Sequence, residues 1–266
     1  MRLPLALLLG AIGMSVLGRV ASAQDPAPPP APPPPAPATG VAPVPADSLA
    51  PFERPNGTLL RAGRLVYHLT VTRAGVALPA GDRTVEVSEA SAGGAPAWML
   101  AESRTGTRVE TRDSLLVARA DLSPVSWSAS TARAQLGVSF TADSAFVAMQ
   151  SYQGRASFTT VLPRGALLTP AMVERIVELL PLRAGYRSGA ALLMFDTGSP
   201  RVMPAELAVD REEQLERRDG AVDCWVVTLR AGVLEERLWV AKATSRVVRT
   251  EQATSSGLLT AVLDGG

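Results

Sequence analysis

The stretch LLMFDTGSP, residues 192–200, holds the residues whose types and spacing most suggest catalysis. An Asp-Thr-Gly-Ser run directly after apolar residues can present the carboxylate of Asp196 at the end of a strand. Hydrolysis by such a carboxylate needs a second one beside it, because two acids that share a proton have their pKa values forced apart. The chain has no second Asp-Thr-Gly or Asp-Ser-Gly sequence.

An aspartic protease therefore stays open only as an alternative, in which a homodimer supplies the second carboxylate. The apolar-apolar-Gly segment that braces the catalytic loop in protease halves does not follow Ser199. Asp, Gly, Ser and Pro also form turns in their own right. We expect Asp196 to cap an ordinary turn between strands, and we predict a protein that is not an enzyme.

Other catalytic and metal-binding patterns are sparse. His68 is the single histidine and Cys224 the single cysteine, so a His-rich metal site and an intramolecular disulfide are excluded. Cys224 alternates with apolar residues, which favours a buried, unreactive thiol. No G-x-S-x-G, phosphate-binding glycine loop or H-E-x-x-H sequence occurs. We predict no catalytic residues, no cofactor and no metal.

The N-terminus indicates export. Residues 1–23 combine Arg2, an apolar run over 3–17 and a small-residue ending at Ala23, which is typical of a cleavable signal peptide. Residues 24–51 form a Pro/Ala-rich linker; its 25–46 stretch holds 11 of the chain's 22 prolines and should run as polyproline II. We interpret the linker as a spacer, with a docking ligand for a proline-binding partner as the alternative. Residues 52–266 form one domain, periplasmic or secreted.

The charge of the mature chain is nearly balanced. Removing Arg2 and Arg19 leaves 24 basic against 25 acidic residues. No segment concentrates the arginines, so we predict no nucleic-acid partner. We also predict no transmembrane segment after signal cleavage, because the apolar run is shorter than the roughly 20 residues that span a bilayer.

Alternation of apolar and polar residues dominates the domain. RLVYHLTVT, RTVEVSE and QLGVSF each place apolar side chains on one face, as half-buried antiparallel strands do. Asp219-Gly220 between two such runs predicts a hairpin. Turn residues at regular spacing predict roughly ten strands, in a mainly β domain.

One segment has helical spacing instead. Thr169 can cap a helix, Pro170 suits its first position and Pro181 ends it. Glu174, Arg175 and Glu178 lie opposite an apolar stripe made by Met172, Val173, Ile176, Val177 and Leu180. We expect this short helix to pack its stripe into the sheet as core or, alternatively, to gate a cavity, with Gly165 and Gly185 as flexible joints.

Several motifs resemble a known superfamily. LLPLRAGY after the helix, DCWVVTL, and ERLWVAKATSRVVRTE with Trp239 resemble the periplasmic lipoprotein-carrier (lipoprotein-sorting-like) superfamily, and within it an uncharacterised family of secreted bacterial domains. Ala241 stands where those families often have an acidic residue. The resemblance implies an incomplete antiparallel β-barrel wrapped around a helix, with an apolar cavity that takes acyl chains.

We therefore expect a non-enzymatic envelope domain that holds an acyl chain or a lipidated partner in an apolar cavity. The candidate cavity residues are Tyr67, Leu69, Phe140, Ile176, Val177, Trp225 and Trp239. The alternative is a structural envelope domain whose barrel is simply packed.

Overall fold

A computed structural model of the protein describes residues 55–106, 110–152, 154–163, 167–196 and 199–265. The predicted signal peptide, the proline-rich linker and Gly165 lie outside these residues. The described part is mainly β, as predicted, with one short α-helix. The expected number of strands, roughly ten, was wrong, because the described residues form fifteen. The strands are β1 (Gly63–Arg73), β2 (Val76–Ala92), β3 (Ala95–Thr105), β4 (Thr111–Ala118), β5 (Pro124–Thr131), β6 (Ala134–Phe140), β7 (Ser144–Ser151), β8 (Gly154–Val161), β9 (Leu167–Leu168), β10 (Arg187–Asp196), β11 (Ser199–Arg217), β12 (Gly220–Ala231), β13 (Leu234–Ala241), β14 (Arg246–Thr254) and β15 (Gly257–Leu263).

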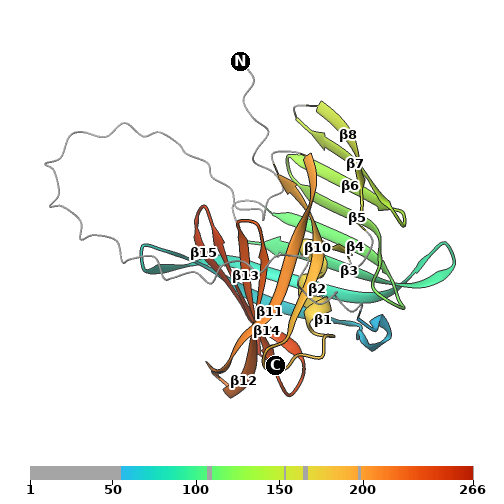
Figure 1. Ribbon diagram of the computed structural model, residues 1–266. Coiled ribbons are helices and arrows are strands. Elements are labelled where there is room, and N and C mark those ends of the chain that lie inside the picture. The colour runs from blue at the N-terminus through green and yellow to red at the C-terminus, as the bar shows by residue number, and fades with distance from the viewer. Residues whose placement is uncertain (1–54, 107–109, 153, 164–166, 197–198, 266) are drawn as a thin grey trace, which may run out of the picture.

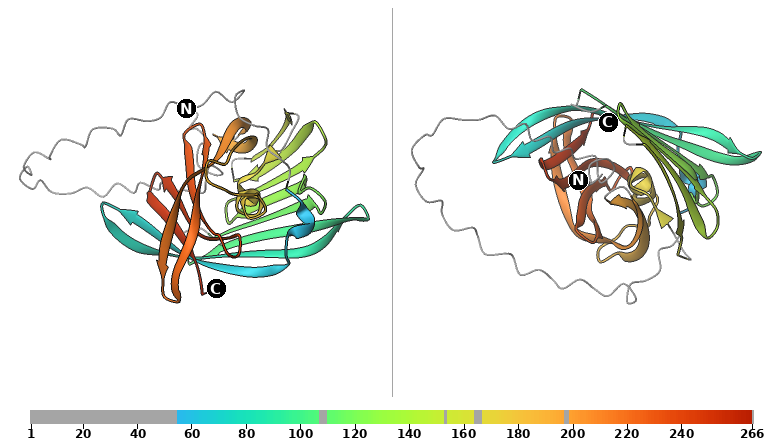
Figure 2. Two further views of the ribbon diagram at one scale, coloured as in Figure 1. Left: turned by 60° about the horizontal axis from the view of Figure 1, so that its bottom comes forward. Right: turned by 90° about the horizontal axis from the view of Figure 1, so that it is seen from above.

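All fifteen strands belong to one sheet, in the order β8-β7-β6-β5-β4-β3-β2-β1-β15-β14-β13-β12-β11-β10-β9. From β1 to β8 and from β10 to β15, consecutive strands pair antiparallel, and the β1–β15 pair joins the two halves of the chain. The short β9 pairs with β10 in parallel. The N-terminal strands form a broad arch, under which the C-terminal strands curl into a tighter roll (Figures 1 and 2). The described sheet is thus an open, barrel-like roll with β8 and β9 at its edges.

Strands that lack a strong apolar pattern explain the low strand count expected from the sequence. The β8 sequence GRASFTTV is exposed at most of its positions, and β5 carries serine at every other position, in PVSWSAST. Edge strands and strands with one polar face bury few apolar side chains, so their periodic signal is weak.

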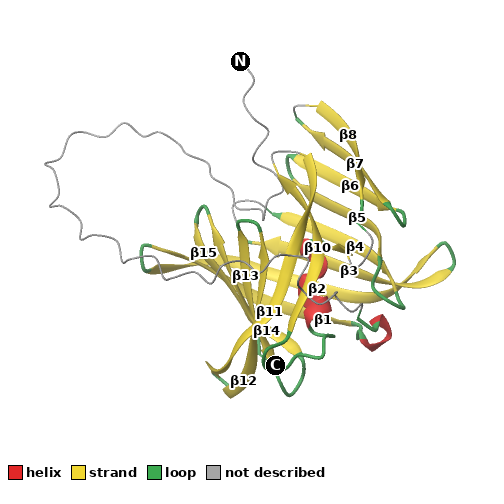
Figure 3. Ribbon diagram, in the orientation of Figure 1, coloured by secondary structure: helices red, strands yellow, loops and turns green. Residues whose placement is uncertain are grey.

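The predicted helix begins where its sequence indicates. A 3-10 turn, η3 (Pro170–Met172), leads into α1 (Val173–Val177), although Thr169 makes no side-chain cap bond. Figure 3 shows this helix in red between the two halves of the sheet. Its apolar stripe is buried as expected, but the charged side is buried as well, because the roll surrounds the helix. Arg175 is only 3% exposed.

Two apolar clusters fill the interior. The larger joins the inward faces of β3–β7 to the helix and to β10–β13, where the Trp127 and Phe195 rings lie 5.5 Å apart. The smaller joins β1 and β2 to β11–β15. Neighbouring residues of β12 point into different clusters, Val226 into the smaller and Val227 into the larger. The C-terminal roll is therefore buried on both faces at its centre.

Two predicted turns are confirmed. Arg217 pairs with Gly220 across the β11–β12 hairpin, at the predicted Asp219-Gly220 sequence. Asp196 pairs with Ser199 across the β10–β11 hairpin, so the DTGS stretch connects two antiparallel strands. Within the described residues, no helix is long and apolar enough to span a bilayer.

Candidate functional site: a groove across the outer face

An ion-pair network surrounds α1 inside the roll. Arg83 on β2 contacts Glu174, with Nη2 and Oε1 2.6 Å apart, and its guanidinium lies 4.4 Å from the centre of the Tyr67 ring. Arg175 pairs with Glu178 at 2.9 Å and donates a hydrogen bond to the Tyr67 hydroxyl at 3.2 Å. Burial raises the pKa of Tyr67 to about 12, so its hydroxyl stays protonated.

The same network extends along the sheet to β3, β4 and β13. Arg104 pairs with Glu102 at 2.8 Å. Burial, reinforced by the charge of Glu102, raises the pKa of Asp113 to about 7. Burial, reinforced by the charge of Glu174, likewise raises the pKa of Glu236 to about 7. Near-neutral carboxyls can mark catalytic sites, but structural ion networks perturb pKa values in the same way. Here the two carboxyls lie near the ion pairs around the helix, and the charges of Arg104 and Arg83 partly oppose the rise of their pKa values.

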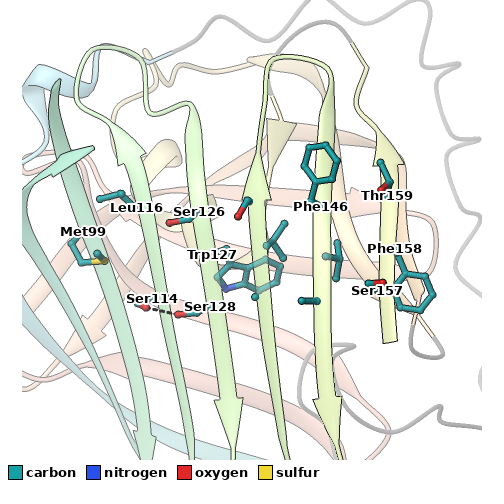
Figure 4. A pocket seen from close by; sticks show the side chains of 15 residues that line it. Met99, Ser114, Leu116, Ser126, Trp127, Ser128, Phe146, Ser157, Phe158 and Thr159 are labelled. Carbon is teal, nitrogen blue, oxygen red and sulfur yellow. Dashed lines mark hydrogen bonds between the residues drawn. The ribbon is translucent and has the colours of Figure 1, made fainter. Parts of the chain in front are cut away.

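A groove of about 690 Å³ lies on the opposite, outer face of β3–β8 (Figure 4). Its fifteen lining residues are all uncharged, and six of them carry a hydroxyl: Ser114, Ser126, Ser128, Ser139, Ser157 and Thr159. Ser114 and Ser128 are joined by a hydrogen bond of 2.7 Å. A second hollow of about 320 Å³ shares these two serines and continues towards Ser103, Arg112 and Ser130. Three acidic residues also line it: Glu86, Glu102 and Asp113.

The strand registers explain why a groove forms here. Residues paired from strand to strand make rows that cross the sheet. The floor row consists of small side chains: Ala101, Ser114, Ser128, Gly137, Ala148 and Ser157. The arginine row lies beside it: Ser103, Arg112, Ser130, Gln135, Gln150 and Arg155. The Phe146 row lies on its other side: Met99, Leu116, Ser126, Ser139, Phe146 and Thr159.

Small residues between two rows of longer ones leave a channel that runs across the strands. Six strands at about 4.8 Å spacing make the floor row about 24 Å long, and rows two residues apart are about 6.8 Å from each other. The channel can therefore hold an extended chain perpendicular to the strands.

The seven predicted cavity residues are not gathered around one hollow. Tyr67, Leu69 and Trp239 belong to the smaller core cluster, and Ile176 and Val177 belong to the larger one. Phe140 and Trp225 are partly buried against the larger cluster. None of the seven lines the groove.

Sequence reasoning missed the groove residues, although their signal was present. Stretches such as WSAST and LGVSF alternate apolar residues with serine or glycine. The apolar positions of these stretches indicate a core face, whereas the small positions between them carry no signal of a site within any single strand. Only the registers show that these small positions align across six strands.

Comparisons with known proteins support the fold. No protein-family model matches the chain, and no curated protein matches it. It is similar to the crystal structure of a β-barrel-like protein from Brucella abortus with a domain of unknown function, DUF1849. The TM-score is 0.50 at 12% sequence identity, and the match covers 76% of this chain and 94% of that one. This likeness shows a β-barrel-like fold; it does not support membership of the lipoprotein-carrier superfamily.

Proposed function

We propose that the protein is a non-enzymatic binding domain of the bacterial envelope, which holds an extended ligand in the outer groove. The observation that carries this proposal is the groove itself, uncharged along its lining and about 690 Å³ in volume. Small-molecule sites are typically hollows of about 300–1,000 Å³ with few charged groups. The predicted signal peptide and the proline-rich spacer support a position outside the cytoplasm.

A binding role fits the chemistry of the groove better than catalysis does. Its lining contains no histidine, cysteine or carboxylate that would act as a nucleophile or a general base. Asp113 and Glu236, whose carboxyl pKa values are near 7, are absent from that lining, although Asp113 lines the second, smaller hollow.

The ligand expected from the sequence, an acyl chain or a lipidated partner in an interior cavity, would need space around the helix. Ile176 and Val177 are at most 2% exposed and Tyr67 is fully buried. An acyl chain could enter there only if α1 and its ion pairs moved. The outer groove is already open, so we place the ligand there.

A second candidate function is structural. The packed interior and the ion network are what a rigid envelope domain needs, whether or not the groove binds anything. The two functions differ in whether the groove, rather than the fold alone, is required for attachment to the envelope.

Filling the groove tests the proposal. Gly137 lies on the floor row, and an added Cβ would meet no atom within 4 Å. Gly137→Phe should therefore fill the groove while leaving the strand unstrained. Gly63→Phe is the matched control, since Gly63 also lies in a strand and its added Cβ meets nothing within 4 Å.

The measurement is co-sedimentation of the purified protein with isolated bacterial envelopes. We expect wild type and Gly63→Phe to sediment with the envelopes, and Gly137→Phe to lose at least ten-fold in affinity. Equal sedimentation of all three proteins, or none for wild type, would reject the proposal and favour the structural role. Melting temperatures within a few degrees of each other are required of all three.

A further inference from the structure

The arginine row gives the groove one charged border. Arg112 on β4 and Arg155 on β8 are exposed, and neither makes an ion pair or hydrogen bond with another described side chain. Four strand spacings separate them, which is about 19 Å. Between them lie the neutral side chains of Ser130, Gln135 and Gln150. Free guanidiniums at separated points favour a ligand with several negative charges along its length.

The opposite border is of mixed polarity. Phe146 is 49% exposed, and Met99 and Leu116 are half-buried in the same row. Hydroxyls alternate with them, at Ser126, Ser139 and Thr159. A ligand here meets apolar contacts and hydrogen-bonding groups at short intervals along its length.

We infer that the ligand of the groove is an acidic glycan, whose chain lies along the floor row across β3–β8. This inference rests on the proposed function. Sugar rings present apolar C–H faces to Phe146, Leu116 and Met99, and their hydroxyls exchange hydrogen bonds with the serines. Carboxylates or sulfates along the chain pair with Arg112 and Arg155.

Two other envelope ligands fit less well. An acyl chain would cover the hydroxyls of Ser126, Ser139 and Ser157 without offering them hydrogen bonds, and burying unpaired hydroxyls is costly. A flat membrane surface contacts protruding residues, whereas the floor row is the lowest part of this face. Glu86 pairs with Ala101 and continues the floor row onto β2, where its charge would repel an anionic chain. The glycan is therefore confined to β3–β8.

The test compares three probes with the purified protein. These are polygalacturonate as the acidic glycan, dextran as the neutral one, and vesicles of phosphatidylglycerol and phosphatidylcholine. We expect polygalacturonate to bind, dextran to bind at least ten-fold more weakly, and vesicles not to bind. Binding of polygalacturonate should weaken steeply between 50 and 500 mM salt, because exposed charges are screened.

Paired variants locate the contact. Arg112→Gln with Arg155→Gln should lower the affinity for polygalacturonate at least ten-fold and flatten its salt dependence. Arg73→Gln with Arg218→Gln removes the same charge from exposed positions outside the groove and should leave affinity within two-fold. If both double variants lost the same affinity for polygalacturonate, the overall charge of the protein would explain the binding, and the inference would be overturned.

The remaining outcomes separate this inference from the proposed function. If the protein binds vesicles or a fluorescent fatty acid but not polygalacturonate, the inference of an acidic glycan ligand is wrong. Loss of that binding in Gly137→Phe would then still support the groove as the binding site. If Gly137→Phe sediments with envelopes as well as wild type does, the proposal that the groove is the binding site is wrong.

Discussion

Arg83 on β2 and Glu174 on α1 form an ion pair inside the roll, with 2.6 Å between Nη2 and Oε1, and the side chains are 7% and 12% exposed. The pair connects the broad N-terminal arch to the only α-helix of the described chain. Because a helix of one to two turns is unstable alone, such contacts must hold α1 in place. A helix that looked amphipathic in sequence is thus fixed through both of its faces.

Removing one partner of this pair should be strongly destabilising. Glu174→Gln leaves the buried guanidinium of Arg83 with Glu102 as its nearest carboxylate, 3.9 Å away. We expect the free energy of unfolding in urea to fall by about 3–5 kcal/mol. Glu235→Gln is the control, because its ion pairs with Arg237 and Arg230 are exposed and should each contribute at most about 1 kcal/mol. Equal effects of the two variants would contradict the role given to the network.

Cys224 should be unreactive in the folded protein. Its side chain is fully buried, and burial raises the pKa of the thiol to about 11, so little thiolate forms at neutral pH. We expect a thiol reagent such as DTNB to label Cys224 only in denaturant. Rapid labelling of the native protein at pH 8 would show that β12 opens or that the thiol is exposed.

The sequence was informative about local structure. Alternation in RLVYHLTVT and QLGVSF predicted strands, and Thr169-Pro170 predicted where the helix begins. These features depend on neighbouring residues. The strands that the sequence did not predict were those, such as β8, that bury little apolar surface.

The candidate site could not be predicted in the same way. Ser114, Ser128 and Gly137 come from three strands, and nothing local to any of them specifies that they pair side by side. The buried position of Arg175 likewise depends on the roll that closes around α1. Strand register and curvature are set by the whole sheet, so single-strand patterns do not report them.

Asp196 should tolerate removal of its charge. It lies at the end of β10 and pairs with Ser199 across the hairpin. Asparagine forms the same local turn bonds as aspartate, so Asp196→Asn should change stability by no more than about 1 kcal/mol. Peptide cleavage at acidic pH that Asp196→Asn abolishes would instead establish the protease alternative.

The apolar stripe of the helix should respond to polarity more strongly than to size. Ile176→Asp places an unpaired carboxylate in the larger core cluster, where only 2% of the residue is exposed, and should destabilise the domain by a few kcal/mol. Val177→Ala removes two buried methyl groups and should cost about 1–3 kcal/mol. Because the ligand is placed outside the roll, Val177→Ala should not change envelope binding. If it did, a ligand beside the helix, as first expected from the sequence, would be favoured.

The pH dependence of stability should report the buried carboxyls. The pKa of Asp113 and of Glu236 is about 7 in the folded protein, whereas unfolded carboxyls titrate near 4. Between about pH 4 and pH 7, the folded state therefore holds protons that the unfolded state has released. The stability contributed by these groups is largest near pH 4, falls as the pH rises, and is constant above about pH 7.

Neutral substitutions of these carboxyls should reduce the fall of the unfolding free energy with rising pH. Asp113→Asn and Glu236→Gln mimic the protonated side chains, so each should flatten the decline in unfolding free energy between pH 4.5 and 7, by at most about 1.4 kcal/mol per pH unit. Other groups contribute to the wild-type curve, since burial also raises the pKa of Glu178, and hydrogen bonds to Asp82 and Asp264 raise that of His68. The comparison is therefore made between each variant and wild type. Glu89→Gln, at a side chain 66% exposed, is the control and should leave the slope unchanged. A slope that stays the same in both Asp113→Asn and Glu236→Gln would mean that these carboxyls are ionised and solvated in the folded protein.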